Sequence, residues 1–157
     1  MITPTAAVKA ARQGIEKYGL HKSQGMPADL ANLSVEPPIL IRRLDVPDRD
    51  YYLVPWKAES GIVLIGEVDA STGVMSNAAP LPIPLSRLVM SPEEAGRIVD
   101  ERWHPSIIGE PRLVWCPCRE SSSPFQPLYQ IATDKGEAFV GIDGSIYSSL
   151  TPFGRGG

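Results

Sequence analysis

The chain has 157 residues, of which 43% are hydrophobic and 21% charged, so it has enough apolar side chains for a core and is unlike a disordered chain. Its formal net charge of −3 excludes the broad basic surface that would neutralise nucleic-acid phosphates. No apolar run approaches the roughly 18 residues that a membrane-spanning helix needs. We therefore expect a protein that binds neither nucleic acid nor membrane.

The first predicted element is an amphipathic helix that begins after Thr3. Thr3 suits the N-cap, Pro4 suits the first helical position, and Gly19 is a typical stop. Apolar residues recur at helical spacing and predict one buried stripe: Val8, Ala11, Ile15 and Tyr18. The charged residues of this region are interpreted as a solvated helix face: Lys9, Arg12, Glu16, Lys17 and Lys22. This segment lacks the continuous apolar region of an export signal, which favours a cytoplasmic location.

The apolar pattern changes to that of β-strands after residue 38. Residues 39–44 and 51–56 are rich in β-branched and aromatic side chains, and the Asp- and Pro-containing loop between them predicts a hairpin. Residues 61–68 add a third strand, which a turn over residues 69–73 closes with one residue at positive φ. The proline-rich segment 80–90 is expected to be an extended linker.

The second half of the chain repeats this order of helix and three strands. Ser91 suits an N-cap, Pro92 suits the first helical position, and the helix should end before Pro105. Strands are predicted at residues 112–116, 128–133 and 137–143. We therefore divide the chain into a first unit (1–79), a linker (80–90), a second unit (91–153) and a flexible tail (154–157).

A Gly-to-Asp signature occurs in both halves, in residues 61–75 and 136–147. Each copy has a Gly that opens a strand, an apolar run broken by a second Gly, an apolar-Asp pair and a turn. A duplicated signature of this kind indicates two copies of one small fold. The expected fold class is α+β, with two units that each pack one helix on an antiparallel sheet of three to four strands.

Three motifs resemble those of the PepSY family: Ser91-Pro92-Glu93-Glu94-Ala95, Tyr51-Tyr52-Leu53-Val54, and Val68-Asp69-Ala70-Ser71-Thr72-Gly73. The resemblance covers nearly the whole chain, at residues 3–79 and 86–153. It implies two cystatin-like units in tandem, in each of which an antiparallel meander cradles a helix.

The segment Cys116-Pro117-Cys118 is the sharpest candidate for chemistry. With His104 nearby in the sequence, its two thiols could hold a metal, form a redox pair or, with His104 or His21 as base, supply a nucleophile. Zinc sites favour a wider Cys spacing and four ligands, and a disulfide between residues i and i+2 would be strained. We therefore interpret the segment as a strand end with Cys116 facing inward and Cys118 exposed. A small metal- or thiol-dependent enzyme built on Cys116, Cys118 and His104 is kept as the alternative function.

Three carboxylates in one loop raise calcium as a second candidate ligand: Asp45, Asp48 and Asp50. The Gly and Glu of an EF-type loop are missing, so an Asp-rich turn is the better interpretation.

Aromatic residues in the predicted strands suggest a binding function instead. We expect Tyr52, Trp56 and Trp115 to be exposed anchors for a protein or peptide, because Trp and Tyr dominate binding energy at interfaces. Together with the lack of a catalytic motif, this predicts a non-enzymatic protein-interaction module that needs no cofactor. Such a module would bind at an open sheet face or edge, by strand addition or in a shallow groove. An inhibitor, immunity protein or other regulator of a peptidase or toxin is its most specific form. A homodimer is compatible with this prediction, and a structural subunit of a larger assembly is a further alternative.

Overall fold

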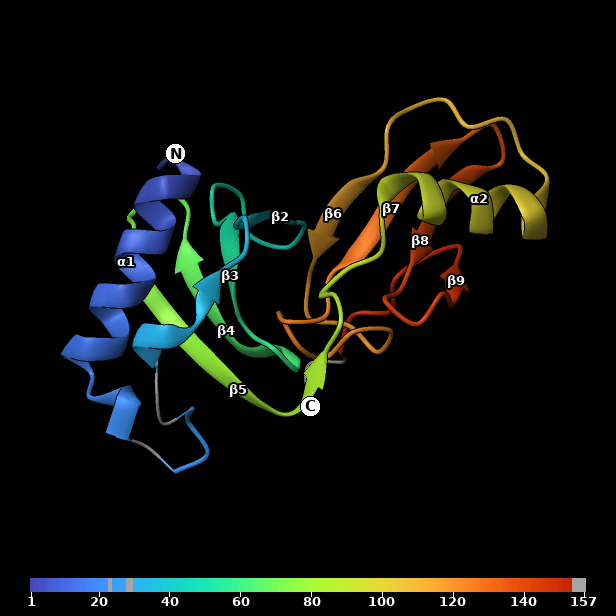
Figure 1. Ribbon diagram of the computed structural model, residues 1–157. Helices are drawn as coiled ribbons and strands as arrows, with labels where there is room; N and C mark the ends of the chain where they lie inside the picture. Colours follow the sequence, from blue (N-terminus) through green and yellow to red (C-terminus); the bar gives the residue numbers. More distant parts are fainter. Residues whose placement is uncertain (23, 28–29, 154–157) are drawn as a thin grey trace. The chain divides into compact units, whose positions relative to one another are not determined.

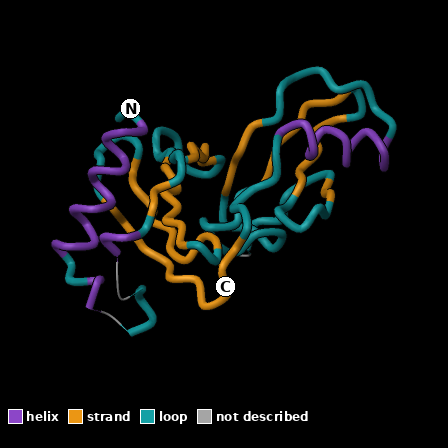
Figure 2. Tube along the Cα trace, in the orientation of Figure 1, coloured by secondary structure: helices purple, strands orange, loops and turns teal. Residues whose placement is uncertain are grey.

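The computed structural model describes residues 1–22, 24–27 and 30–153. Two α-helices, two short 3₁₀ turns and nine strands occur in this part of the chain. Figure 1 shows how the larger elements are arranged, and Figure 2 distinguishes helix, strand and loop along the chain. In chain order they are α1 (Pro4–Lys17), η1 (Leu20–Lys22), η2 (Leu30–Asn32), β1 (Ser34–Val35), β2 (Ile39–Arg43), β3 (Tyr51–Ala58), β4 (Gly61–Asp69), β5 (Met75–Leu85), α2 (Pro92–Trp103), β6 (Arg112–Trp115), β7 (Leu128–Thr133), β8 (Gly136–Val140) and β9 (Ile146–Tyr147).

Both predicted helix starts are confirmed. Oγ1 of Thr3 and Oγ of Ser91 each accept a hydrogen bond at 3.1 Å from the amide three residues further on, as N-caps do. The predicted buried stripe of α1 is wrong at its end, because Tyr18 is 54% exposed. The Lys17 ammonium lies 5.6 Å from the centroid of the Tyr18 ring. Neither helix of the described residues is long and apolar enough to cross a membrane.

The strands do not form two separate sheets of three to four antiparallel strands, so the predicted pair of cystatin-like helix-on-sheet units is wrong. Their pairings follow one order, β5-β4-β3-β2-β6-β7-β8-β9, with β1 paired to β3. All pairs are antiparallel except β2 with β6, which is parallel. The described part of the chain is therefore a mixed, sheet-dominated fold with nine strands and two helices.

Strand β2 is the reason for the difference. Residues Ile39–Ile41 pair with β3, as the predicted hairpin requires, but Arg42 and Arg43 pair with Val114 and Trp115 of β6. A parallel pair needs a partner that is remote in sequence. No local pattern in residues 39–44 announces such a partner.

By internal contacts the chain divides into two compact units. Unit 1 comprises Met1–Ile41 and Asp48–Leu88, and unit 2 comprises Arg42–Pro47 with the chain from Val89 onward. The second half of β2 thus belongs to unit 2. The predicted tail at 154–157 lies outside the described residues.

The core of unit 1 lies between α1 and strands β3 and β4, and Figure 1 shows α1 beside these strands. The small residues Ala7 and Ala11 let the helix approach closely, and both are fully buried. Gly66 of β4 completes the contact, because a Cβ there would lie 3.0 Å from the ring of Trp56. Larger side chains of the core include Trp56, Leu64 and Val68.

Residues 80–85, assigned to a linker from the sequence, form the end of β5. Leu64 of β4 pairs with Pro80, whereas Ile62 pairs with Leu85, so residues 81–84 bulge opposite a single β4 residue. The alternating prolines explain the bulge, because proline has no N–H to donate to a ladder. This end of β5 is exposed, and Ile83 is 78% accessible.

Two hairpins repeat the same turn. The β3–β4 and β7–β8 hairpins close with the pairs Ala58↔Gly61 and Thr133↔Gly136, and both glycines have positive φ, +125° and +108°. A two-residue turn followed by a glycine at positive φ is the usual solution for a short hairpin with a bulge. The duplicated Gly signature therefore marks the start of β4 and of β8.

In unit 2, α2 packs on β7 and β8. Its buried residues Ala95 and Val99 contact a core that includes Ile131 and Val140. A smaller cluster lies around Val114, Cys118, Leu128 and Phe139. Each unit thus has its own buried core.

Candidate binding groove along the first helix

The three predicted aromatic anchors are core residues. Tyr52, Trp56 and Trp115 are 5%, 1% and 6% exposed, so the expectation that they project into solvent is wrong. Two of these buried side chains also form hydrogen bonds: the Tyr52 hydroxyl donates to the Ile2 carbonyl at 3.1 Å, and the Trp115 indole N–H donates to Ser121 Oγ at 3.2 Å. Tyr52 and Trp115 offer no free face to a partner, and Trp56 presents only the small part that lines a hollow described below.

Trp115 is covered by Arg43, whose guanidinium lies 4.8 Å from its ring centroid. Arg43 also donates two hydrogen bonds to Asp45, at 2.8 and 2.7 Å, and these lower the pKa of the Asp45 carboxyl below its ordinary value despite the opposing effect of burial. The carboxylate of Asp45 is therefore committed to an ion pair in the loop where the sequence raised calcium as an alternative.

The two thiols lie in the opposite order to the one expected. Cys118 is fully buried and its Sγ donates to the Ser121 carbonyl at 3.6 Å, whereas Cys116 is half-buried. Burial, followed by the neighbouring Cys118, raises the pKa of Cys116 from an ordinary value of 9.0 to about 11. A nucleophilic or metal-binding cysteine needs its thiolate, and this environment opposes the thiolate near neutral pH.

His104 ends α2 and does not join the thiols in a metal site. It has the left-handed conformation of a C-cap, with φ 49° and ψ 44°, and its N–H donates to the Asp100 carbonyl. Within residues 1–22, 24–27 and 30–153, no three His, Cys, Asp or Glu side chains gather closely enough to hold a metal ion. The geometry of His104 is that of a helix terminus.

Two adjoining hollows along α1 form the candidate site, and we call them together the α1 groove. The first, about 560 Å³, has Ile15 and Trp56 in its apolar lining and is bordered by η1 and η2 through His21 and Leu30. The second, about 530 Å³, runs along the helix past Val8 and reaches Pro38. Both volumes lie in the range of ligand-binding clefts.

Charged residues of α1 line the α1 groove. Arg12 and Glu16, one helical turn apart, border both hollows, and Lys9 borders the second. All three side chains are exposed, and no ion pair joins Arg12 to Glu16 or to another carboxylate of the described residues. The α1 groove therefore combines an apolar lining with a charged rim, of which two of three members are cationic.

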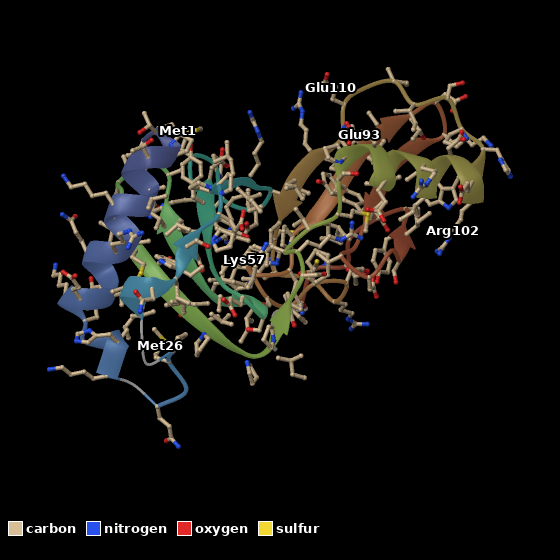
Figure 3. All side chains as sticks on the ribbon, in the orientation of Figure 1. Met1, Met26, Lys57, Glu93, Arg102 and Glu110 are labelled. Atoms are coloured by element: carbon tan, nitrogen blue, oxygen red, sulfur yellow. The ribbon has the colours of Figure 1, made fainter. Side chains whose placement is uncertain are left out.

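One wall of the α1 groove is the helix α1 itself, and the opposite wall includes Leu30. Both walls are packed on the core of unit 1. Ala7, Ala11, Gly14 and Ile15 bury the inner side of α1 against the sheet, which leaves Lys9, Arg12 and Glu16 on the outer side. The opposite wall is anchored through the partly buried Leu30 and Leu33, which pack against the core of unit 1, as does Met26, labelled in Figure 3.

A smaller hollow of about 200 Å³ lies in unit 2, bordered by Glu120, Asp143 and Tyr147. Both carboxylates are used within the fold. Glu120 accepts from the N–H and the hydroxyl of Thr151, each at 2.8 Å, and Asp143 accepts from the N–H and hydroxyl of Ser145, each at 3.0 Å. These bonds lower the pKa of both carboxyls and explain their positions as turn and loop anchors.

Sequence reasoning identified the residues of the α1 groove only as a solvated helix face. The apolar members Ile15 and Trp56 come from segments about 40 residues apart, so no local pattern brings them together. The available signal was the excess of cations on the outer side of one amphipathic helix in an acidic protein.

Comparisons with known proteins do not add a function. No protein-family model and no curated protein matches the chain. One solved structure, the YpmB protein from Bacillus subtilis, is similar at 19% sequence identity, with 92% of this chain and 96% of that chain covered and a TM-score of 0.46.

Proposed function

We propose that this protein is a non-catalytic protein-interaction module that binds a polypeptide in the α1 groove of unit 1. The observation that carries the proposal is the pair of adjoining hollows, which share Arg12 and Glu16 and combine apolar walls with a charged rim. Recognition sites of this kind take an apolar side chain into the cavity and fix its orientation at the polar rim.

A groove suits the chain better than strand addition does. The terminal strand β5 carries Pro80, Pro82 and Pro84, which lack the N–H donors that an added strand would need. The other terminal strand, β9, has two residues. These features favour side-chain recognition at α1 over main-chain pairing at either end of the strand order.

The test compares two variants that introduce the same bulk in unit 1. Ala31 borders the first hollow, so Ala31→Trp is expected to fill it, whereas Ser86→Trp places the same side chain on an exposed loop. Random dodecapeptides displayed on phage are selected against wild-type protein and against each variant. Backbone amide NMR with a selected peptide then locates the contact.

We expect wild-type protein and Ser86→Trp to enrich the same peptides, with amide shifts in α1 and residues 30–38, and Ala31→Trp to lose them. Peptides that survive Ala31→Trp, or shifts confined to unit 2, would contradict the proposal. Circular dichroism of each variant separates lost binding from lost folding.

A further inference from the structure

We infer that the polypeptide bound in the α1 groove is acidic and presents a carboxylate next to a bulky apolar side chain. The inference rests on the binding role proposed above and names the chemistry of the partner. It is carried by the apolar lining of the first hollow, by Lys9 and Arg12 on the rim of the α1 groove, and by the charge contrast between this rim and the rest of the chain.

The apolar part of the recognition comes from the first hollow. Ile15 and Trp56 are 4% and 1% exposed, so most of each side chain is packed in the core and only a small, fixed part faces the hollow. The half-buried Leu30 closes one side and adds to the apolar lining. A hollow of about 560 Å³ is larger than a small side chain such as that of alanine needs. It therefore suits a bulky aliphatic or aromatic residue, which would displace water from an apolar surface.

The polar part comes from Arg12 and Lys9. A guanidinium can donate two parallel hydrogen bonds to one carboxylate, and Lys9 lies one turn before Arg12 on the same side of α1. Glu16 lies one turn after Arg12 and would repel an acidic group. The partner carboxylate is thus directed to the N-terminal side of Arg12, in the second hollow, which adjoins the first hollow that holds the apolar residue.

The charge distribution along the chain points the same way. The protein has 15 Lys and Arg against 18 Asp and Glu, yet residues 1–22 contain four of these cations and only one carboxylate, Glu16. A cationic helix side on an otherwise acidic protein attracts an acidic segment while the remaining surface repels it. This contrast favours one orientation of an acidic partner on unit 1.

The experiment reads the composition of the peptides selected in the display described above. We expect Asp or Glu next to Phe, Leu, Ile or Trp to be enriched in peptides that bind wild-type protein. Arg12→Glu is expected to lower the affinity for a selected acidic peptide roughly tenfold, because it replaces an electrostatic attraction by a repulsion. The control is Arg102→Glu, which makes the same charge change at an exposed position of α2. Arg102 is labelled in Figure 3, and we expect this variant to change the affinity less than about twofold.

A salt titration and a matched peptide complete the test. The affinity of the acidic peptide should fall several-fold between about 50 and 300 mM NaCl, and replacing its Asp or Glu by Asn or Gln should remove this dependence. Enrichment of neutral or basic peptides that still require an open Ala31 site would overturn the acidic partner but leave the proposed function standing.

Two other outcomes would contradict these proposals. One would overturn both the proposed function and the acidic partner, and the other would assign the α1 groove to a second copy of the chain. If no peptide distinguishes wild-type protein from Ala31→Trp, the groove is not a peptide site and the proposed function falls with this inference. If sedimentation shows self-association of the wild-type chain that Ala31→Trp abolishes, the occupant is a second copy, and the acidic peptide is overturned.

Discussion

At the scale of single residues, the two glycines inside the helices have opposite surroundings. A Cβ on Gly14 of α1 would lie 2.6 Å from the Cβ of Met75, an atom that cannot move without the β5 backbone. A Cβ on Gly96 of α2 would meet only the terminal methyl of Ile107 at 3.7 Å, which is ordinary contact. Gly14 is therefore required by helix-to-sheet packing, and Gly96 is not.

We predict opposite signs for the same substitution at these positions. Gly96→Ala should raise the free energy of unfolding by up to about 1 kcal/mol, because alanine favours the helix. Gly14→Ala gains the same propensity but overpacks the core at a cost of about 1–3 kcal/mol, so the net effect should be destabilising. Urea unfolding of the two variants measures both values, and a stabilised Gly14→Ala protein would contradict the close approach of α1 to β5.

A second prediction at this scale concerns the Cys116 thiol. Burial, then Cys118, raises the pKa of Cys116 from 9.0 to about 11, so the folded protein keeps this proton in a pH range where the unfolded chain releases it. The protonated Cys116 thiol therefore contributes to the free energy of unfolding. This contribution is complete below pH 9 and is lost as pH rises towards 11. We expect Cys116→Ala to show a smaller loss of Tm than wild-type protein over that range.

Alkylation provides the direct measurement. Iodoacetamide should modify Cys116 slowly at pH 7, with a rate that rises up to about pH 11, and should modify Cys118 only after unfolding, because Cys118 is fully buried. Fast modification of Cys116 near neutral pH would contradict the raised pKa and would favour the thiol-dependent alternative.

At the scale of elements, the two hairpins share a turn but differ in what surrounds it. Gly61 and Gly136 both have positive φ, where a side chain is strained. A Cβ on Gly61 would also lie 2.6 Å from the Leu85 carbonyl oxygen at the end of β5, whereas a Cβ on Gly136 would have nothing within 4 Å. The first hairpin is thus packed against its neighbour, and the second is open.

We predict that Gly136→Ala costs about 1–2 kcal/mol of unfolding free energy, from backbone strain alone. Gly61→Ala should cost more than Gly136→Ala, because it adds the clash with the β5 backbone to the same strain. Thermal unfolding of the two variants measures the difference. Equal losses would show that β5 does not press on this turn.

At the scale of the whole molecule, the chain leaves unit 1 at Arg42 and returns to it at Asp48. Leu40 packs against the core of unit 1, whereas Arg43 stacks on Trp115 in unit 2, and the Leu44 N–H donates to the Trp115 carbonyl at 3.0 Å. Neighbouring residues of one strand therefore support different cores.

We predict that substitutions three residues apart have separate effects. Arg43→Ala should raise amide hydrogen exchange in β6 and leave α1 unchanged, and Leu40→Ala should raise exchange in α1 and β3 and leave α2 unchanged. Hydrogen–deuterium exchange with mass spectrometry reads all of these segments in one experiment. If either variant affected both helices equally, the division of β2 between the two units would be wrong.

Local chemistry accounts for the parts of this fold that were predictable from the residues. The N-caps at Thr3 and Ser91, the turn glycines at 61 and 136, and the Asp69 turn, where Oδ1 accepts from the Ser71 and Thr72 amides, all depend on groups within a few residues of one another. The resemblance to the PepSY family stays a prediction.

Long-range packing decided the rest. Whether Trp56 is an exposed anchor or a cavity wall depends on α1, which lies about 40 residues away, and the sharing of β2 depends on β6, about 70 residues away. Strand alternation shows that a side chain faces one side of a sheet, but it does not show what covers that side. The sequence by itself therefore determined where the helices and turns begin, because their hydrogen bonds and steric limits are local. Only the tertiary structure decided the strand order and the α1 groove, because both depend on segments that the chain brings together from a distance.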